Sequence, residues 1–62
     1  MSYDFDTLFQ EFISDPITKQ SGFPQTHTGF VTYCSLMYND AVDDGIAPDP
    51  MWVWVLGNHP PL

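Results

Sequence analysis

Residues 28–45, with the sequence TGFVTYCSLMYNDAVDDG, form the longest stretch of the chain with a helical pattern of apolar side chains. These side chains recur at steps of three and four residues, the spacing that gathers them on one face of an α-helix. They are Phe30, Val31, Tyr33, Cys34, Met37, Tyr38, Ala41 and Val42. Thr28 is the expected N-cap, and Gly45 is expected just past the helix end, where a left-handed backbone favours glycine. The pattern predicts a helix over 28–44 on which the rest of the chain packs.

The N-terminal stretch carries a second amphipathic pattern. Its apolar residues fall at positions i, i+3, i+4, i+7 and i+8, namely Phe5, Leu8, Phe9, Phe12 and Ile13. Ser2 or Asp4 can cap the first turn, because a short polar side chain accepts hydrogen bonds from the free backbone N–H groups. Pro16 ends the pattern, since the residue before a proline is disfavoured in the α region. We therefore expect a helix over 4–14.

Two shorter segments each follow an Asp and begin with a Pro, which is typical of a helix start. The sequence predicts short helical turns near 16–21 and 50–56, ended by Gly22 and Gly57. Phe23 is expected to tuck under the loop that follows the first of them.

The segment 51–56 also has a strand-like alternation of valine and tryptophan. A strand there would lack a partner strand in this chain and would leave backbone groups unpaired, so a helix is favoured. Strand addition to the sheet of another protein stays open as an alternative. Residues 57–62 are expected to form a turn and then an extended, proline-rich end.

Together these patterns predict an all-α fold in a single small domain, 1–62. Its centre is a helical hairpin of the segments 4–14 and 28–44, with the two short helical turns packed across it. A chain of this size buries only about 60% of its unfolded surface. The lone Cys34 excludes an intramolecular disulfide. A partner, or a second copy of the chain in a homo-oligomer, is therefore expected to add stability.

The charge balance is strongly acidic. Eight Asp and Glu residues stand against one cation, Lys19, which gives a formal net charge of −7. Such a chain does not neutralise phosphates, so direct binding to nucleic acid or to an anionic membrane is not expected. A basic protein surface is the natural electrostatic complement. The alternative is that the acidity only keeps an aromatic-rich small protein in solution.

An antiparallel hairpin would place the start of the first helix beside the end of the second. The acids that would meet there, as one acidic pole, are Asp4, Asp6, Asp40, Asp43 and Asp44. Carboxylates at the negative end of a helix dipole are unfavourable by about 0.3–1 kcal/mol, which suggests that they have a use. The alternative is that Asp43 and Asp44 simply form a turn with Gly45.

This acidic stretch does not match a calcium-binding loop. With Gly45 at the sixth position, Asp40 and Asp44 take the first and fifth positions. Val42 then occupies the third position, and Met51 occupies the twelfth, where a Glu is required. We expect no metal or other cofactor, and at most a weak divalent site.

The sequence also offers little for catalysis. Cys34, His27 and His59 are too few and too far apart in sequence for a recognisable zinc site. A nucleophilic thiol needs an electropositive setting, which a chain with a single cation does not supply. Cys34 lies on the apolar stripe of its predicted helix, so we expect a buried, inert thiol and a protein that is not an enzyme.

The function class that remains is recognition of another protein. Five Phe, three Tyr, two Trp and three Met are more than a core of this size easily encloses. Trp and Tyr dominate binding hot spots, so Trp52 and Trp54 are the first candidates, with Tyr38 beside the acids. One tryptophan is expected to face inward and the other outward. The alternative is that both tryptophans serve the core.

The sequence thus favours a small, non-enzymatic acidic protein that binds a larger protein with a basic surface and inhibits or modulates it. A bacteriophage-encoded inhibitor of a host nucleic-acid enzyme fits this description. One alternative is an accessory subunit buried permanently in a complex. Another is a DNA mimic, which the small number of acids disfavours. Because residues 1–14 lack the pattern of a signal peptide, a cytoplasmic location is expected.

Overall fold

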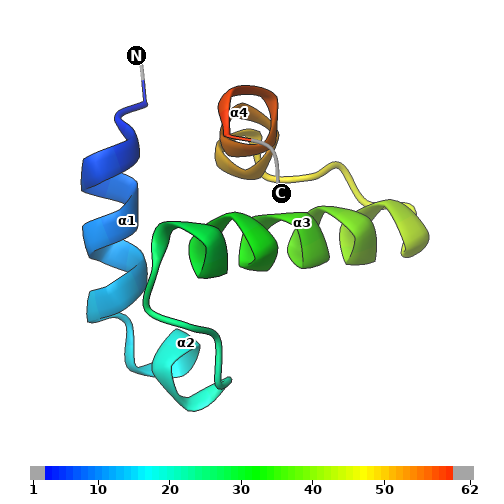
Figure 1. Cartoon of the computed structure of the whole chain (residues 1–62). Helices are drawn as coiled ribbons and strands as arrows, with labels where there is room; N and C mark the ends of the chain where they lie inside the picture. Colours follow the sequence, from blue (N-terminus) through cyan, green and yellow to red (C-terminus); the bar gives the residue numbers. More distant parts are fainter. Residues whose placement is uncertain (1–2, 60–62) are drawn as a thin grey trace.

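The computed structural model describes residues 3–59, and within that range it consists of helices joined by short connections (Figure 1). The helices are α1 (Phe5–Ser14), α2 (Pro16–Gln20), α3 (His27–Asp43) and α4 (Pro50–Asn58). Residues 3–59 contain no strand, so the all-α fold class and the helical form of 50–56 are confirmed. The expected cap at Ser2 and the extended end at 60–62 lie outside the described residues.

A side chain caps the N-terminus of each of these helices. Three caps are carboxylates that accept a backbone N–H: Asp4 from Thr7 at 3.1 Å, Asp15 from Ile17 at 2.9 Å and Asp49 from Met51 at 2.8 Å. The fourth is Thr26, whose hydroxyl accepts from the backbone N–H of Gly29 at 3.1 Å. The prediction of Thr28 as the cap of α3 is therefore wrong. The earlier start brings Gly29 into the first turn, where its lack of a side chain is needed.

The C-terminal end of α3 forms as predicted. Gly45 has a φ of 73°, and its backbone N–H donates to the carbonyl of Val42 at 3.1 Å. The N–H of Ile46 donates to the carbonyl of Ala41 at 2.9 Å, which completes a Schellman motif. The backbone alone thus satisfies the last carbonyls of α3.

Two more helix ends test the predicted terminators. Gly22 has a φ of 82° and follows α2, as expected. Gly57 is inside α4, which continues to Asn58, so its prediction as a terminator is wrong. The carbonyl of Trp54 accepts from the side-chain amide of Asn58 at 2.8 Å, and that of Val55 accepts from the backbone N–H of His59 at 2.7 Å. These bonds satisfy the end of α4 without a left-handed residue at position 57.

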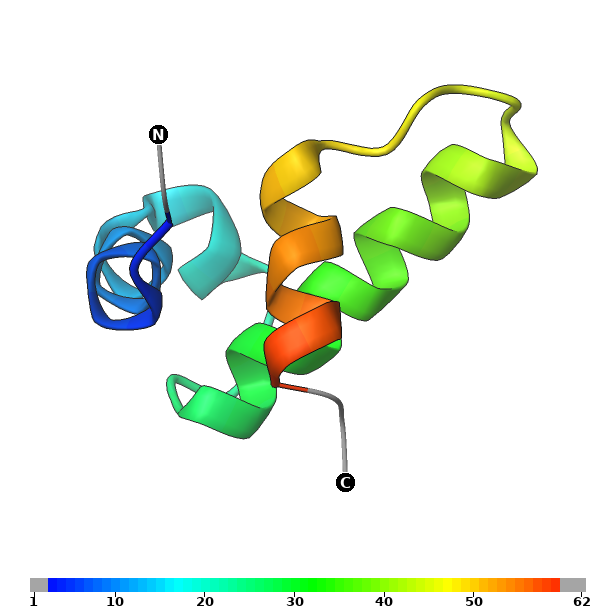
Figure 2. The same cartoon turned by 90° about the horizontal axis from the view of Figure 1, so that it is seen from above.

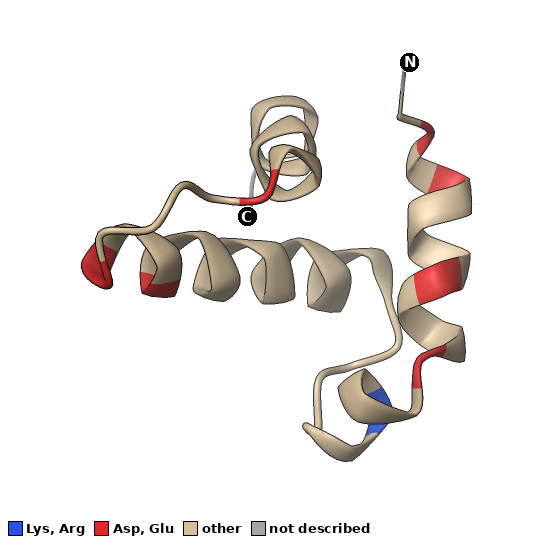
Figure 3. Cartoon of the chain, turned by 180° about the vertical axis from the view of Figure 1, so that it is seen from behind, with Lys and Arg blue, Asp and Glu red and all other residues tan. Residues whose placement is uncertain are grey.

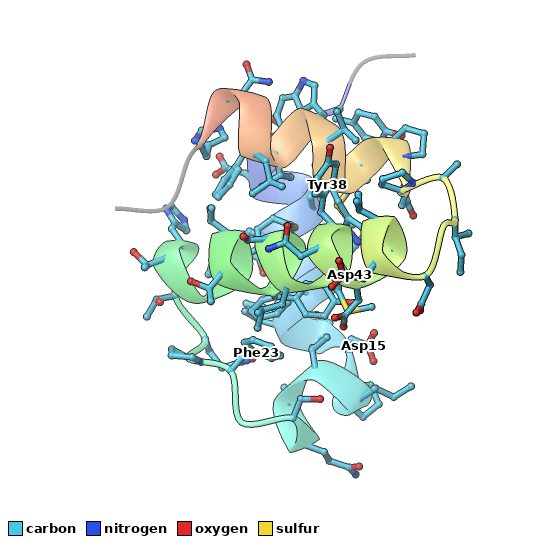
Figure 4. All side chains as sticks on the ribbon, turned by 90° about the vertical axis from the view of Figure 1, so that its right-hand side faces the viewer. Asp15, Phe23, Tyr38 and Asp43 are labelled. Atoms are coloured by element: carbon cyan, nitrogen blue, oxygen red, sulfur yellow. The ribbon has the colours of Figure 1, made fainter. Side chains whose placement is uncertain are left out.

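The hairpin is formed by α3 and α4, which run in opposite directions and cross obliquely (Figures 2 and 4). The predicted partner of α3, the helix at 4–14, instead lies crosswise at the N-terminal end of α3 (Figure 1). The connection through α2 turns the chain before α3 begins. Because α4 is apolar on all sides, it offers the long helix more surface to bury than the one-sided α1 does.

The core lies where α1, α3 and α4 meet. Its buried side chains are Phe12, Phe30, Val31, Cys34 and Val55. Phe30 is 1% exposed, and its ring centroid lies 5.1 Å from that of Phe12 and 5.5 Å from that of Phe5. Phe23 packs edge-on against Tyr33 at 5.4 Å, which confirms that it tucks under its loop. The long helix is therefore anchored through aromatic contacts at its first turns.

The buried hydroxyl of Thr18 fixes α2 to the end of α1. It donates to the backbone carbonyls of Phe12 at 2.6 Å and Asp15 at 2.9 Å. The carbonyl of Phe12 also accepts from the backbone N–H of Asp15 at 3.3 Å. A polar group without a partner is costly inside a protein, so these bonds hold the short helix α2 in place.

The loop before α3 passes very close to the helix at Gly29. A Cβ atom added there would lie 2.0 Å from the carbonyl oxygen of Pro24. Backbone atoms cannot rotate out of the way as a side chain can, so the loop would have to move. Gly57 offers the opposite case within α4, because a Cβ atom there meets nothing within 4 Å.

We therefore predict opposite effects for the same substitution at these two glycines. Gly29→Ala should lower the free energy of unfolding by about 1–3 kcal/mol, the usual cost of overpacking, or by more. Gly57→Ala should raise it by up to about 1 kcal/mol, because alanine is the better helix former. Urea unfolding followed by circular dichroism measures both. Equal stability of the two variants would contradict the close approach of Pro24.

Candidate functional site

The acidic side chains divide by what they do in the fold. Asp4, Asp15 and Asp49 are N-caps, and Asp6 lies in the first turn of α1, near the positive end of its dipole. The other four carboxylates accept no hydrogen bond within residues 3–59: Glu11, Asp40, Asp43 and Asp44. Local structure therefore explains only half of the acids.

Three of the unexplained acids lie in the last turn of α3 and just after it. Asp40, Asp43 and Asp44 are all exposed, at the negative end of the helix dipole. The alternative, that Asp43 and Asp44 form a turn with Gly45, agrees with the structure, in which a turn at Asp44 and Gly45 follows Asp43 directly. The hydrogen bonds of that turn come from the backbone, and no carboxylate takes part. The turn therefore does not require these charges.

The five predicted acids do not form one pole. Asp4 and Asp6 belong to the start of α1, which lies at the opposite end of α3 from its last turn (Figures 1 and 3). The prediction of a single acidic pole is wrong, because it assumed an antiparallel pairing of α1 with α3. The charge instead lies at separate ends of the molecule.

Exposed apolar side chains accompany the acids between residues 42 and 53. Val42 is 52% exposed, Ile46 61% and Val53 49%. This stretch runs from the end of α3 through the connecting segment into α4, and its charged residues are Asp43, Asp44 and Asp49. We call the exposed side chains of this stretch the 42–53 surface. It combines apolar groups with one sign of charge.

The predicted aromatic residues lie next to this surface. Trp52 and Trp54 are both half-buried against the core, so the prediction of one inward and one outward ring is wrong. Residues two apart point to nearly opposite sides of a helix, yet both of these large rings reach the core and stay partly accessible. Tyr38 is also half-buried and extends from α3 toward α4 (Figure 4). All three rings retain an accessible part.

A small pocket lies between α1, α2 and α3, beside the start of α4. Its volume is about 160 Å³, below the roughly 300–1,000 Å³ of typical small-molecule sites. Its apolar lining residues are Leu8, Phe12, Phe30 and Met51. Glu11, Asp15 and Tyr33 line it with polar groups. The pocket has room for one side chain rather than for a metabolite.

The sequence patterns described above do not predict this pocket. The signal that could have indicated it is the spacing of Leu8, Glu11 and Asp15, which follow each other at helical steps of three and four residues. Burial raises the pKa of the Tyr33 hydroxyl, with further contributions from Cys34, Asp15 and Asp49. The negative charge of Asp15 and Asp49 therefore acts on Tyr33, which lines the pocket.

Cys34 is fully buried, as predicted from its place on the apolar stripe. Burial, helped by the negative charge of Asp49, raises the pKa of its thiol to about 12. The imidazole rings of His27 and His59 pack instead against Phe5, with centroid distances of 5.0 and 4.0 Å. The raised pKa keeps the Cys34 thiol in its protonated, weakly reactive form.

This raised pKa predicts an alkaline loss of stability. In the unfolded chain the thiol loses its proton near pH 8.5, whereas the folded protein keeps it up to about pH 12. Rising pH therefore favours the unfolded state between these values, by at most about 1.4 kcal/mol per pH unit. Urea unfolding at about pH 7 and about pH 9 measures the change, before tyrosines of the unfolded chain titrate near pH 10.

Cys34→Ala is the control for this measurement. It should be less stable than the wild type at neutral pH, because it leaves a cavity, but it should lose less stability on going to alkaline pH. An identical pH dependence in the two proteins would show that the thiol is not responsible.

Within residues 3–59, no helix is long and apolar enough to cross a lipid bilayer, and no three His, Cys, Asp or Glu side chains gather as metal ligands would. The candidate binding sites are therefore the 42–53 surface and the pocket lined by Glu11 and Asp15. Comparisons with protein-family models, curated proteins and solved structures found nothing that matches this chain.

Proposed function

We propose that this protein binds a larger protein that has a basic surface, and that the 42–53 surface makes the contact. By covering that basic surface it would inhibit or modulate the partner, without being an enzyme. The observation that carries the proposal is the exposure of Val42, Ile46 and Val53 in the same stretch as Asp43 and Asp44, two carboxylates that cap no helix N-terminus. Apolar side chains supply burial on binding, and the charges select the partner.

The composition of α4 supports the apolar part of this proposal. No residue from Pro50 to Asn58 is charged, and the helix has no polar face to turn toward water. A helix that is apolar all round is normally covered on all sides. Its inner side meets α3 and the core, so its outer side is available to a partner. Trp52 and Trp54, half-buried on this helix, belong to the residue types that dominate hot spots.

The distribution of charge supports the basic partner. Lys19 is the single cation of the chain, and it lies in α2, on the other side of α3 from α4 (Figures 3 and 4). The 42–53 surface therefore presents only negative charge. A one-signed surface speeds the encounter with an oppositely charged partner and slows the encounter with like-charged ones.

The alternatives differ in what they require of these features. An accessory subunit would use the same apolar helix, but it would bury it permanently and depend little on charge. A DNA mimic would need a dense, continuous row of acids, whereas the acids here lie at separate ends of the molecule. A bacteriophage origin, a cytoplasmic location and self-association stay predictions.

Affinity capture tests the proposal. The tagged protein should retain a partner with a basic surface from a lysate of its source organism at physiological salt, and mass spectrometry identifies it. Association with the purified partner should slow steeply as salt is raised, because screening removes the long-range attraction. Salt-independent association would favour the accessory subunit. A stable monomer that retains no partner would contradict both.

Two isoleucines provide a matched test of the surface. Ile46→Ser, within the 42–53 surface, should weaken partner binding by about tenfold, since a partner-covered side chain loses its burial. Ile17→Ser is the control, because Ile17 is 72% exposed but lies on α2. Surface plasmon resonance with the purified partner measures both. Equal binding by the two variants would remove the 42–53 surface from the interface.

A further inference from the structure

We infer that the pocket between α1, α2 and α3 is a binding site for one arginine side chain of a partner protein. Met51 is the one lining residue of the pocket that also belongs to the stretch 42–53, and neither inference depends on the other. The pocket is lined by the buried rings of Phe12 and Phe30 and by the exposed residues Glu11 and Asp15, a combination that matches a long side chain with a cationic end.

The size of the pocket sets the kind of ligand. At about 160 Å³ it is smaller than the sites that enclose metabolites and cofactors. Its apolar lining residues are Leu8, Phe12, Phe30 and Met51, which can pack against the methylene groups of a long side chain. An extended side chain entering from a partner surface would fill it, while the partner backbone stays outside.

The carboxylates of Glu11 and Asp15 set the charge of the ligand. Glu11 lies in the last turn of α1, Asp15 directly follows the helix, and both exposed residues line the pocket. Asp15 uses Oδ1 to accept from the backbone N–H of Ile17, while its Oδ2 accepts no hydrogen bond within residues 3–59. Lys19, the single cation of the chain, does not line the pocket. The charged side chains that line the pocket are thus both negative, which favours a cationic ligand.

The aromatic and hydroxyl groups favour arginine over lysine. A guanidinium group is planar, stacks on aromatic rings and offers five N–H donors in a fixed geometry. Tyr33 and Phe12 contribute rings to the pocket, and the two carboxylates and the Tyr33 hydroxyl contribute acceptors. A lysine ammonium is more strongly hydrated and cannot stack, so it gains less in a partly buried site.

Nuclear magnetic resonance titration with N-acetyl-arginine methylamide tests the inference on the isolated protein. The blocked amino acid should bind saturably with a dissociation constant on the order of 1 mM, and it should shift amide signals around the pocket. The citrulline analogue has nearly the same shape without the charge and should bind at least about tenfold more weakly. The lysine analogue should also bind more weakly. Equal binding of arginine and citrulline, or of arginine and lysine, would overturn the inference.

Two double variants with the same change in charge locate the site. Glu11→Gln with Asp15→Asn should weaken arginine binding by at least about tenfold. Asparagine is a good N-cap, so α2 should keep its start. Asp43→Asn with Asp44→Asn removes the same two charges at the end of α3 and should bind like the wild type. Equal effects of the two would indicate nonspecific attraction to a negative protein and would overturn the inference.

A single variant guards against loss of the fold. Glu11→Gln alone removes no hydrogen bond within residues 3–59, so its circular dichroism should match that of the wild type, and it should still weaken arginine binding several-fold. Unchanged binding in this variant would overturn the inference. Free arginine, with its charged ammonium and carboxylate groups, should bind no better than the blocked form. Tighter binding of the free amino acid would assign the pocket to a small-molecule ligand.

Discussion

The structure depends on the packing of Phe30 in the second turn of α3. Its ring is almost fully buried, and it meets the rings of Phe5, Phe9 and Phe12 on α1. Because these contacts are made near the start of the long helix, α1 has to cross α3 there and cannot lie along it. The rest of α3 is left to α4, which forms the hairpin.

This crossing also decides where the charges lie. The acids of α1 are held at one end of α3, and those at 40–44 project at the other. The acids that cap helices would be present in any protein of this architecture, since a carboxylate at a helix N-terminus is locally stabilising. Asp43 and Asp44 have no such role, and neither has Glu11. Acids without a local role are the better guide to binding.

The two candidate sites combine the same two kinds of side chain. Each places apolar side chains next to carboxylates that have no cation to pair with inside residues 3–59. The 42–53 surface is exposed and is proposed to meet the face of a partner, whereas the pocket has room for one side chain. A chain this small has too little interior to enclose all of its apolar side chains, so some rings and valines stay partly exposed.

Local signals in the sequence were enough to determine the four helices. Asp-Pro pairs, amphipathic spacing and Gly45 place most of their ends, because these ends depend on hydrogen bonds between residues near in sequence. Cys34 was also correctly placed inside, from its position on an apolar stripe. The tertiary structure alone decided the pairing of α3 with α4, the separation of the acids and the pocket at Glu11 and Tyr33. These features depend on which side chains fill the space around Phe30 and on the close approach of Pro24 to Gly29, and no local pattern encodes contacts between distant segments.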